Sequence, residues 1–170
     1  MPDVRKIKHK IYMRTQSSSG AKTASVYRNL IKQAILITLR SEQVAITCVI
    51  NVLITDDKGI RKYNQQYRDV DRVTDVLSFP MQEFKQACWL GIEEMEIDLD
   101  TGMLPLGDIV ISTQRAKQQA GKHRISLEQE TAHLIIHSTL HLLGYDHNNN
   151  KNENIMQSKE GALLKDMGYL

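Results

Sequence analysis

The chain has 170 residues and a mass of 19.4 kDa, with 41% hydrophobic residues, 25% charged residues and a formal net charge of +2. These values exclude an intrinsically disordered chain, a collagen-like repeat and a disulfide scaffold. The length predicts one domain over residues 1–170, with a core large enough to be stable without cross-links. The balance of charges neither requires nor excludes a nucleic-acid partner.

The pattern predicts neither a membrane segment nor an export signal. The apolar stretches at 34–39 and 44–54 fall far short of the roughly 20 residues that span a bilayer, and the basic N-terminus lacks the apolar core of a signal peptide. Cys48 and Cys88 stand far apart without a CxxC pairing, which argues against a zinc ribbon or a redox motif. We therefore expect a cytoplasmic protein that has no membrane partner.

In the first part of the chain, strands alternate with helices. Lysines that alternate with apolar residues predict a half-exposed strand at a sheet edge. Apolar residues at helical spacing predict a helix that begins at Thr23 or Ser25 and packs into the core rather than against a partner. A run of Val, Ile and Thr predicts a buried strand, and Asp56 and Asp57 can cap the helix after it. The predicted elements are a strand over 4–13, a flexible break over 17–20, a helix over 23–40, a strand over 44–55 and a helix over 56–67.

The second part of the chain begins with a strand and ends with helices. Residues 81–106, which include the acidic stretch 93–100, predict a surface loop or an extra hairpin. Ser126 can begin the longest helix of this part, and Gly144 can end it in the left-handed conformation. The predicted elements are strands over 75–80 and 107–112 and helices over 113–122, 126–143 and 152–167.

This order of elements predicts an α+β fold with one small mixed sheet of about four strands packed against helices. The sequence shows no internal repeat and no boundary between domains. The helix over 126–143 is the central one, and its end carries the clearest candidate for a functional site.

Three histidines fall at and just after the end of this helix. His137 and His141 are four residues apart, so their rings lie on one helical face and can both reach one zinc ion. Gly144 can turn the chain back, which brings His147 to the same point. Three protein ligands would leave a fourth position for water, as in catalytic zinc sites. We therefore predict one bound zinc ion, although three imidazoles also suit nickel, copper or iron.

The same histidines allow other interpretations. They could cap the helix end or pair with acids without a metal, and His133, one turn earlier, could be a further ligand but fits better as a supporting residue. The histidine spacing also equals that of the metzincin zinc peptidases, which place a glutamate base directly after the first histidine. Ser138 occupies this position, and its hydroxyl cannot accept a proton at neutral pH, so a peptidase is the weaker alternative.

Three motifs together resemble the YbeY family of bacterial metal-dependent endoribonucleases. The first motif is the stretch 137–147, HSTLHLLGYDH. The second combines 64–68, NQQYR, with 74–80, TDVLSFP, and the third is 106–112, LGDIVIS. Their order and separations match the family, and the resemblance extends from about Val44 to the end of the sequence.

The resemblance implies a compact α+β fold, a zinc-type site held by all three histidines of the cluster, and a role in ribosomal RNA maturation and ribosome quality control. It implies RNA, the small ribosomal subunit and its assembly factors as partners, and it places Arg68 on the functionally important arginine of the family. Two positions depart from the pattern: Ser138 where the family usually has Gly, and Val73 where it often has Pro. We expect the Ser138 hydroxyl near the site, where it could narrow access or orient water.

These assignments lead to a hypothesis for RNA cleavage. The metal would activate a water or polarise a phosphoryl oxygen, and Arg68 would hold the phosphate through its planar fork of donors. From the residues alone, Arg68 could instead form a surface ion pair with Asp69 or Asp71. Asp108 and Asp146 could orient the ligand rings or serve as turn and cap residues. The nucleophile stays open between water and the 2′-hydroxyl of the RNA.

The sequence also contains two groups of basic residues and allows two further functions. The basic residues over 5–14 could bind RNA, but a solubilising edge strand explains them as well, and we favour the strand. A second basic group consists of Arg61, Lys62, Arg68 and Arg72. The alternative functions are a ribosome-assembly factor whose metal is structural, and a zincin-like hydrolase or peptidase on the same ligand frame.

Overall fold

The computed structural model describes residues 4–16, 21–84 and 95–170. In chain order, its elements are the 3₁₀ turn η1 (Val4–Lys6), β1 (Lys10–Gln16), α1 (Ala21–Ser41), β2 (Cys48–Thr55), α2 (Asp57–Arg68), β3 (Val76–Pro80), β4 (Leu104–Ser112), α3 (Thr113–His123), α4 (Leu127–Leu142) and α5 (Asn150–Asp166). The predicted α+β class with one four-stranded mixed sheet is confirmed for this part of the chain. None of the helices in these ranges has the length and apolar character needed to cross a bilayer.

The sheet has the strand order β1-β2-β4-β3. β1 pairs with β2 and β2 with β4 in parallel, whereas β3 runs antiparallel to β4. Parallel neighbours need a long connection, which α1 provides between β1 and β2. Gly107 pairs with Pro80 at the end of β3 and has a φ of +144°, and a side chain there would collide with the Phe79 carbonyl oxygen. Glycine therefore permits the close pairing of β3 with β4.

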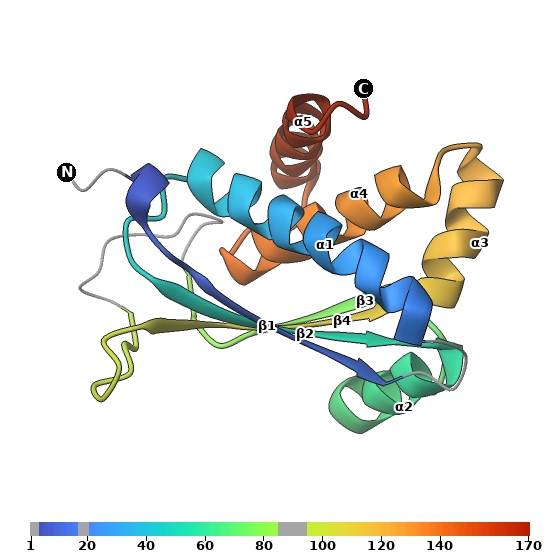
Figure 1. Ribbon diagram of the computed structural model, residues 1–170, viewed down its shortest axis with the longest axis horizontal. Coiled ribbons are helices and arrows are strands. Elements are labelled where there is room, and N and C mark those ends of the chain that lie inside the picture. Colours follow the sequence, from blue (N-terminus) through green and yellow to red (C-terminus); the bar gives the residue numbers. More distant parts are fainter. Residues whose placement is uncertain (1–3, 17–20, 85–94) are drawn as a thin grey trace.

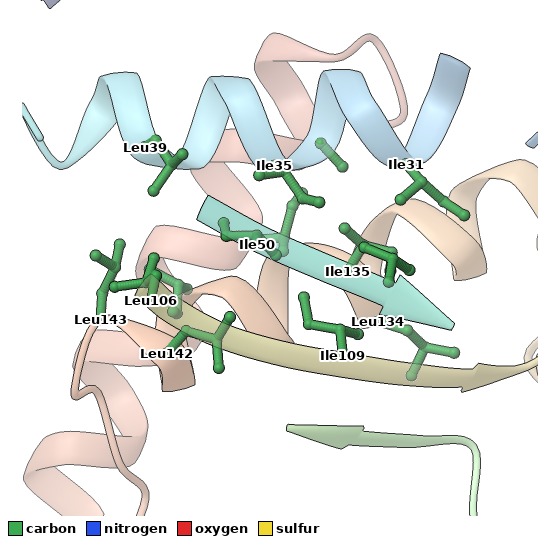
Figure 2. Close-up of a cluster of buried hydrophobic side chains, with 14 of the residues drawn as sticks. Ile31, Ile35, Leu39, Ile50, Leu106, Ile109, Leu134, Ile135, Leu142 and Leu143 are labelled. Carbon is green, nitrogen blue, oxygen red and sulfur yellow. The ribbon is translucent and has the colours of Figure 1, made fainter. Parts of the chain in front are cut away.

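Helices α1, α3 and α4 lie on one side of the sheet and α2 lies on the other (Figure 1). The main core fills the space between α1, α4 and the sheet, and its larger side chains include Ile31, Ile35, Leu39, Ile50, Leu106, Ile109, Ile135 and Leu142 (Figure 2). A smaller cluster of Ile60, Leu77 and Val110 lies under α2. Each such side chain contributes about 1.5–3 kcal/mol when it is fully buried, so the core holds α4 firmly in place.

Helix α4 is the central helix of the fold. It contacts α1, α3, α5, β3 and β4, and buried residues occur on nearly all of its faces. Ser126 caps its first turn as predicted, because the side chain accepts a hydrogen bond from the Gln129 N–H. The last turn of α4 therefore carries its side chains on a rigid support.

Most predicted elements are confirmed, and their ends differ where pairing and turns decide them. The first strand begins at Lys10 rather than at residue 4, because its partner β2 begins only at Cys48. Helix α1 is followed by a turn in which Gln43 has a left-handed backbone (φ 53°) and the Val44 N–H donates a hydrogen bond to the Leu39 carbonyl. Strand β2 begins only after this turn.

Of the predicted starts of α1 and α2, the first is wrong and the second is confirmed. Helix α1 begins at Ala21, so Thr23 and Ser25 lie inside it and the prediction that one of them begins the helix is wrong. Asp56 caps α2 as predicted, because its side chain accepts a hydrogen bond from the Gly59 N–H at 2.9 Å.

The irregular segment before β4 is only partly described. Residues 85–94, which include Cys88 and the start of the acidic stretch, lie outside the described ranges, so the extra hairpin stays a prediction. The rest of the acidic stretch contains a turn in which the Asp98 carboxylate accepts hydrogen bonds from the N–H and hydroxyl of Thr101. β4 begins at Leu104, three residues earlier than predicted.

Candidate metal centre

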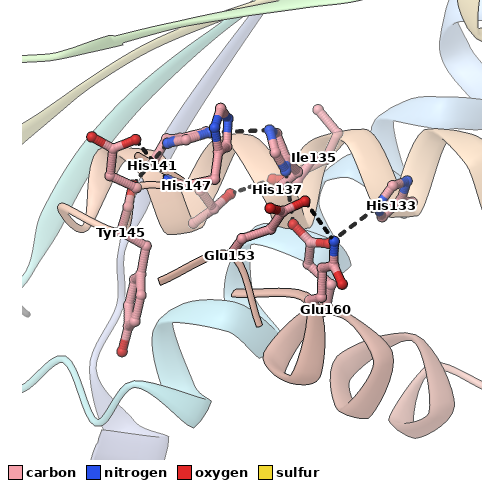
Figure 3. Close-up of polar contacts among 11 residues, drawn as sticks. His133, Ile135, His137, His141, Tyr145, His147, Glu153 and Glu160 are labelled. Carbon is pink, nitrogen blue, oxygen red and sulfur yellow. Dashed lines mark hydrogen bonds and ion pairs between the residues drawn. The ribbon is translucent and has the colours of Figure 1, made fainter. Parts of the chain in front are cut away.

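The candidate metal centre lies at the C-terminal end of α4. His137 and His141 occupy successive turns of this helix, and Gly144, with a φ of +85°, turns the chain so that His147 returns to them. The Nε2 atoms of His137 and His141 are 3.0 Å apart, and one ring nitrogen from each of the three histidines lies within 4.8 Å of the other two. The structure thus brings together the three histidines that the sequence singles out (Figure 3).

A carboxylate on α5 supports the first of these histidines. Oε1 of Glu160 lies 2.7 Å from Nδ1 of His137, and Oε2 lies 3.3 Å from Nε2 of His133 (Figure 3). Burial alone would raise the pKa of Glu160, but the hydrogen bonds from His133 and His137 outweigh it and hold the pKa at about 2. Glu160 is therefore ionised at neutral pH, and it can only accept hydrogen bonds.

The hydrogen bonds determine which ring nitrogens carry hydrogen. Nδ1 of His141 lies 2.8 Å from the carbonyl oxygen of Tyr145, and a carbonyl oxygen can only accept. Nδ1 of His137 faces the ionised Glu160, so both Nδ1 atoms carry hydrogen. Burial, and after it the neighbouring His137, lower the pKa of His141, so the His141 ring is neutral at neutral pH. In a neutral ring of this tautomer, Nε2 holds a lone pair.

The arrangement of ring nitrogens fits a bound cation. The Nε2 atoms of His137 and His141 face each other across 3.0 Å. Two nitrogens at ordinary zinc distances and a tetrahedral angle would be about 3.3 Å apart, close to this separation. His147 is exposed and approaches from the loop, so the group stays open on one side. Three imidazoles in this geometry suit a zinc-type ion with a free position.

Sequence reasoning missed Glu160, although the chain contains a signal for it. Glu160 shares a helical face with three buried apolar residues of α5, Met156, Leu163 and Leu164, and it is only 7% exposed. A carboxylate on a buried face needs a partner, because an unpaired buried charge is very costly. The spacing therefore indicates a partner for Glu160, but only the tertiary structure shows that this partner is a histidine of α4.

A second support anchors the loop after α4. The Tyr145 hydroxyl donates to Oε2 of Glu42 at 2.5 Å, and Lys159 donates to Oε1 of the same carboxylate at 2.8 Å. Glu42 thus connects the end of α1, the loop and α5. Because the Tyr145 carbonyl orients His141, this network also helps to place a ring of the candidate site.

The other predicted supporting residues lie elsewhere. His133 points at Glu160, so it supports the site indirectly, as expected, rather than joining the three histidines. Asp146 accepts a hydrogen bond from the backbone N–H of His147 at 2.6 Å. Asp108 accepts from the Asn51 amide at 2.8 Å. Among the described residues, neither aspartate makes a hydrogen bond to a ring of the three histidines.

Arg68 reaches the same cavity as the three histidines. This cavity has a volume of about 440 Å³, and Arg68 lines it together with all three rings. Arg68 is the last residue of α2, and its Nη2 donates to the Ser78 carbonyl at 3.0 Å. Asp71 pairs with Arg61 instead, at 2.6 Å. Within residues 4–16, 21–84 and 95–170, Arg68 forms no ion pair, so the alternative of a surface pair is not observed.

Ser138 does not face the cavity. Its side chain is fully buried, and its hydroxyl has no hydrogen-bond partner among the described residues. The expectation that this hydroxyl narrows access to the site or orients water is therefore wrong, because consecutive residues of a helix point in different directions. Val73, the second departure, packs against the small cluster under α2, away from the three histidines.

Fold and site together define an α+β protein with an open three-histidine centre at the end of its central helix. Residues 12–168 match the family model described as Endoribonuclease YbeY. The chain belongs to this family, and the resemblance seen in the three motifs is confirmed.

Curated relatives support the same assignment. The chain is 41% identical to Endoribonuclease YbeY of Clostridium botulinum over 144 residues, which cover 82% of this chain and 87% of the relative. It is 42% identical to the protein of the same name from Caldanaerobacter subterraneus subsp. tengcongensis over 145 residues, or 85% and 90% of the two chains. A solved structure, the solution structure of TM1509 from Thermotoga maritima, matches with a TM-score of 0.58 and 26% identity over 91% of this chain and 87% of the other.

Proposed function

We propose that this chain is a metal-dependent endoribonuclease that cleaves single-stranded RNA during the maturation of ribosomal RNA and in ribosome quality control. The observation that carries the proposal is the 3.0 Å separation of the Nε2 atoms of His137 and His141, which share one cavity with Arg68. Membership in the YbeY family supports the reaction and the substrate class. The same resemblance supports a cytoplasmic location and work with the small ribosomal subunit and its assembly factors.

In this proposal, His137, His141 and His147 hold one zinc ion. When bound, zinc would supply a Lewis acid for a phosphoryl oxygen and would lower the pKa of water. Glu160 and the Tyr145 carbonyl keep the rings oriented, so that little reorganisation is needed when the substrate arrives.

Arg68 would be the phosphate-binding residue. One of its nitrogens donates to the Ser78 carbonyl, which fixes the position of the guanidinium. The planar fork has five N–H donors, so enough of them remain to contact two oxygens of a phosphate. The positive charge would also offset the negative charge that builds up in the transition state. Lysine cannot make the same two-pronged contact.

The alternative functions have less support. A zincin-like peptidase needs a base directly after the first histidine, and Ser138 in this position is buried away from the cavity. A purely structural metal is usually enclosed by four protein ligands, whereas His147 is exposed and the cavity is open.

The test is RNA cleavage measured together with metal content. Wild-type protein should cut a single-stranded RNA, lose this activity in a chelator and regain it with zinc. The variant His141→Ala should lose both zinc and cleavage, while Arg68→Lys should keep zinc and lose most of the cleavage. His123→Ala is the matched control, because His123 contacts Glu130 and lies outside the cavity.

Two results would contradict the proposal. Folded His141→Ala protein that cuts RNA like the wild type would remove the metal centre from the reaction, and undiminished cleavage by Arg68→Lys would remove Arg68. The product ends then identify the nucleophile, since attack by the RNA 2′-hydroxyl leaves a cyclic phosphate and attack by water does not.

A further inference from the structure

A second, larger hollow lies on the face of the sheet that α2 only partly covers. Its volume is about 660 Å³, against about 440 Å³ for the cavity of the three histidines. Its walls include Tyr12 from β1, Phe79 from β3 and Tyr63 and Tyr67 from α2. Tyr12 and Tyr67 are each 59% exposed, so two large aromatic rings face solvent beside a hollow. We call this hollow the aromatic pocket.

The rings of the aromatic pocket form a connected group. Tyr63 and Tyr67 are nearly parallel, with an interplanar angle of 6° and ring centroids 6.2 Å apart. Phe79 meets Tyr67 edge-on at 5.4 Å, which holds the Tyr67 ring from one side. Flat aromatic faces of this kind bind unpaired nucleic-acid bases, because every base has a face that can stack.

Polar groups at the base of the aromatic pocket suit the edge of a base. Asn51 and Asp108, from neighbouring strands, are joined by a hydrogen bond of 2.8 Å and both line the pocket. Only Oδ1 of Asp108 is used in this bond, which leaves Oδ2 as an acceptor for an amino group of cytosine, adenine or guanine. A carboxylate repels phosphate, so the pocket suits a base rather than the RNA backbone. Arg14, which also lines the pocket, supplies a cation for a neighbouring phosphate.

The aromatic pocket and the metal cavity both border β3. Phe79 lines the aromatic pocket, while its neighbours Ser78 and Pro80 line the cavity of the three histidines, because side chains alternate along a strand. Arg68 spans this edge: it donates to the Ser78 carbonyl, and its guanidinium carbon lies 5.7 Å from the centre of the Phe79 ring. An RNA strand that passes around β3 could therefore contact both hollows through adjacent groups.

We propose that the aromatic pocket binds the unpaired base of a nucleotide close to the cleaved phosphodiester bond, with Tyr67 as the stacking surface and Asp108 as the acceptor for an amino-bearing base edge. This inference rests on the proposed function, because it assigns a substrate contact to the same reaction. The protein would then recognise its RNA substrate partly by the identity of the base in this pocket.

The test measures RNA binding without cleavage. Metal-stripped protein is titrated into labelled single-stranded octamers of cytidine, adenosine or uridine, and affinity is followed by fluorescence anisotropy. Tyr67→Ala should weaken binding by about 5- to 150-fold, which corresponds to the 1–3 kcal/mol of one base–aromatic stack. Tyr67→Phe should bind like the wild type, because it keeps the ring. Asp108→Asn should reduce the preference for cytidine and adenosine over uridine.

The controls separate the possible outcomes. Tyr169→Ala removes a tyrosine that lines a different hollow, and it should leave RNA affinity unchanged. If metal-loaded wild type cuts no RNA but Tyr67 still governs RNA binding, the proposed function fails, base binding in the aromatic pocket stands, and its link to a cleaved bond is refuted. If Tyr67→Ala binds every octamer as tightly as the wild type, the pocket assignment is wrong. If this variant instead fails to bind a protein that the wild type binds, the surface is a binding site for that protein.

Discussion

Replacing Glu160 with glutamine tests whether the buried carboxylate orients the metal site. Glutamine has almost the same shape, so its oxygen can still accept from Nδ1 of His137 and its amide can face His133. The charge is lost, however, and a hydrogen bond to a neutral group is roughly half as strong as one to an ionised group. Loss of such a support typically weakens metal binding 10- to 100-fold, or about 1.4–2.7 kcal/mol. We expect Glu160→Gln to fall in this range.

The assay is a zinc titration of metal-free protein against a competing chelator. Glu153→Gln is the matched control, because Glu153 lies on the same helix and its carboxylate contacts Gln157 of that helix. This control loses the same charge without touching a histidine ring, and its zinc affinity should equal that of the wild type. Equal zinc affinities for Glu160→Gln and Glu153→Gln would refute the role that we assign to Glu160.

Three further changes test the surroundings of the site. Ser138→Ala removes a buried hydroxyl that has no partner among the described residues, and it should raise the free energy of unfolding in urea by about 1 kcal/mol; a loss of stability would mean that the hydroxyl is satisfied. Gly144→Ala places a side chain on a residue with a left-handed backbone (φ +85°) and against Phe84. It should lower the free energy of unfolding in urea by at least about 1–2 kcal/mol and weaken zinc binding by displacing His147. An unchanged stability together with an unchanged zinc affinity would contradict this account. Burial raises the pKa of Asp75, but hydrogen bonds from Gln119, Val76 and Thr74 outweigh it and hold the pKa below its ordinary value of 3.8. The Asp75 carboxylate therefore stabilises the fold fully above about pH 4, and this contribution is lost as the pH falls through the lowered pKa. In urea titrations, the difference in free energy of unfolding between the wild type and Asp75→Asn should shrink over this pH range. A difference that stays constant with pH would contradict this role of Asp75.

Local sequence patterns were sufficient to predict the three histidines of the site. The spacing of His137 and His141 places both rings on one helical face, and Gly144 supplies the turn that returns His147. Both effects act within a few residues, so the sequence alone indicates them.

The supports of these histidines depend on contacts that no local pattern encodes. Glu160 reaches the site from α5, Glu42 anchors Tyr145 from just after the end of α1, and Tyr145 contributes a backbone carbonyl whose direction depends on the fold. Asp108 and Asp146 were natural candidates because they lie near motif residues, but proximity in sequence does not determine the direction of a side chain. Arg68 joins the cavity only because β3 pairs beside β4 at the sheet edge, and strand order is a tertiary property.

The elements were likewise easier to predict than their order and ends. Apolar periodicity identifies strands and helices, yet the order β1-β2-β4-β3 places the third strand outside the fourth, which no single segment reveals. The first strand begins at Lys10 because a partner is available only from there. Strand ends of this kind follow from pairing rather than from propensity.

The support that α1 and α5 give to residues 137–147 has a consequence for folding. A synthetic peptide of this segment would contain all three imidazoles but neither Glu160 nor the carboxylate of Glu42 that anchors Tyr145, so it should chelate zinc poorly. In the proposed centre, tight coordination would thus be a property of the assembled protein, and by thermodynamic linkage a bound ion would stabilise that assembly in return. At a free ion concentration 100 times its dissociation constant, this gain in stability is about 2.7 kcal/mol. Docking of α5 and binding of the metal would therefore each strengthen the other.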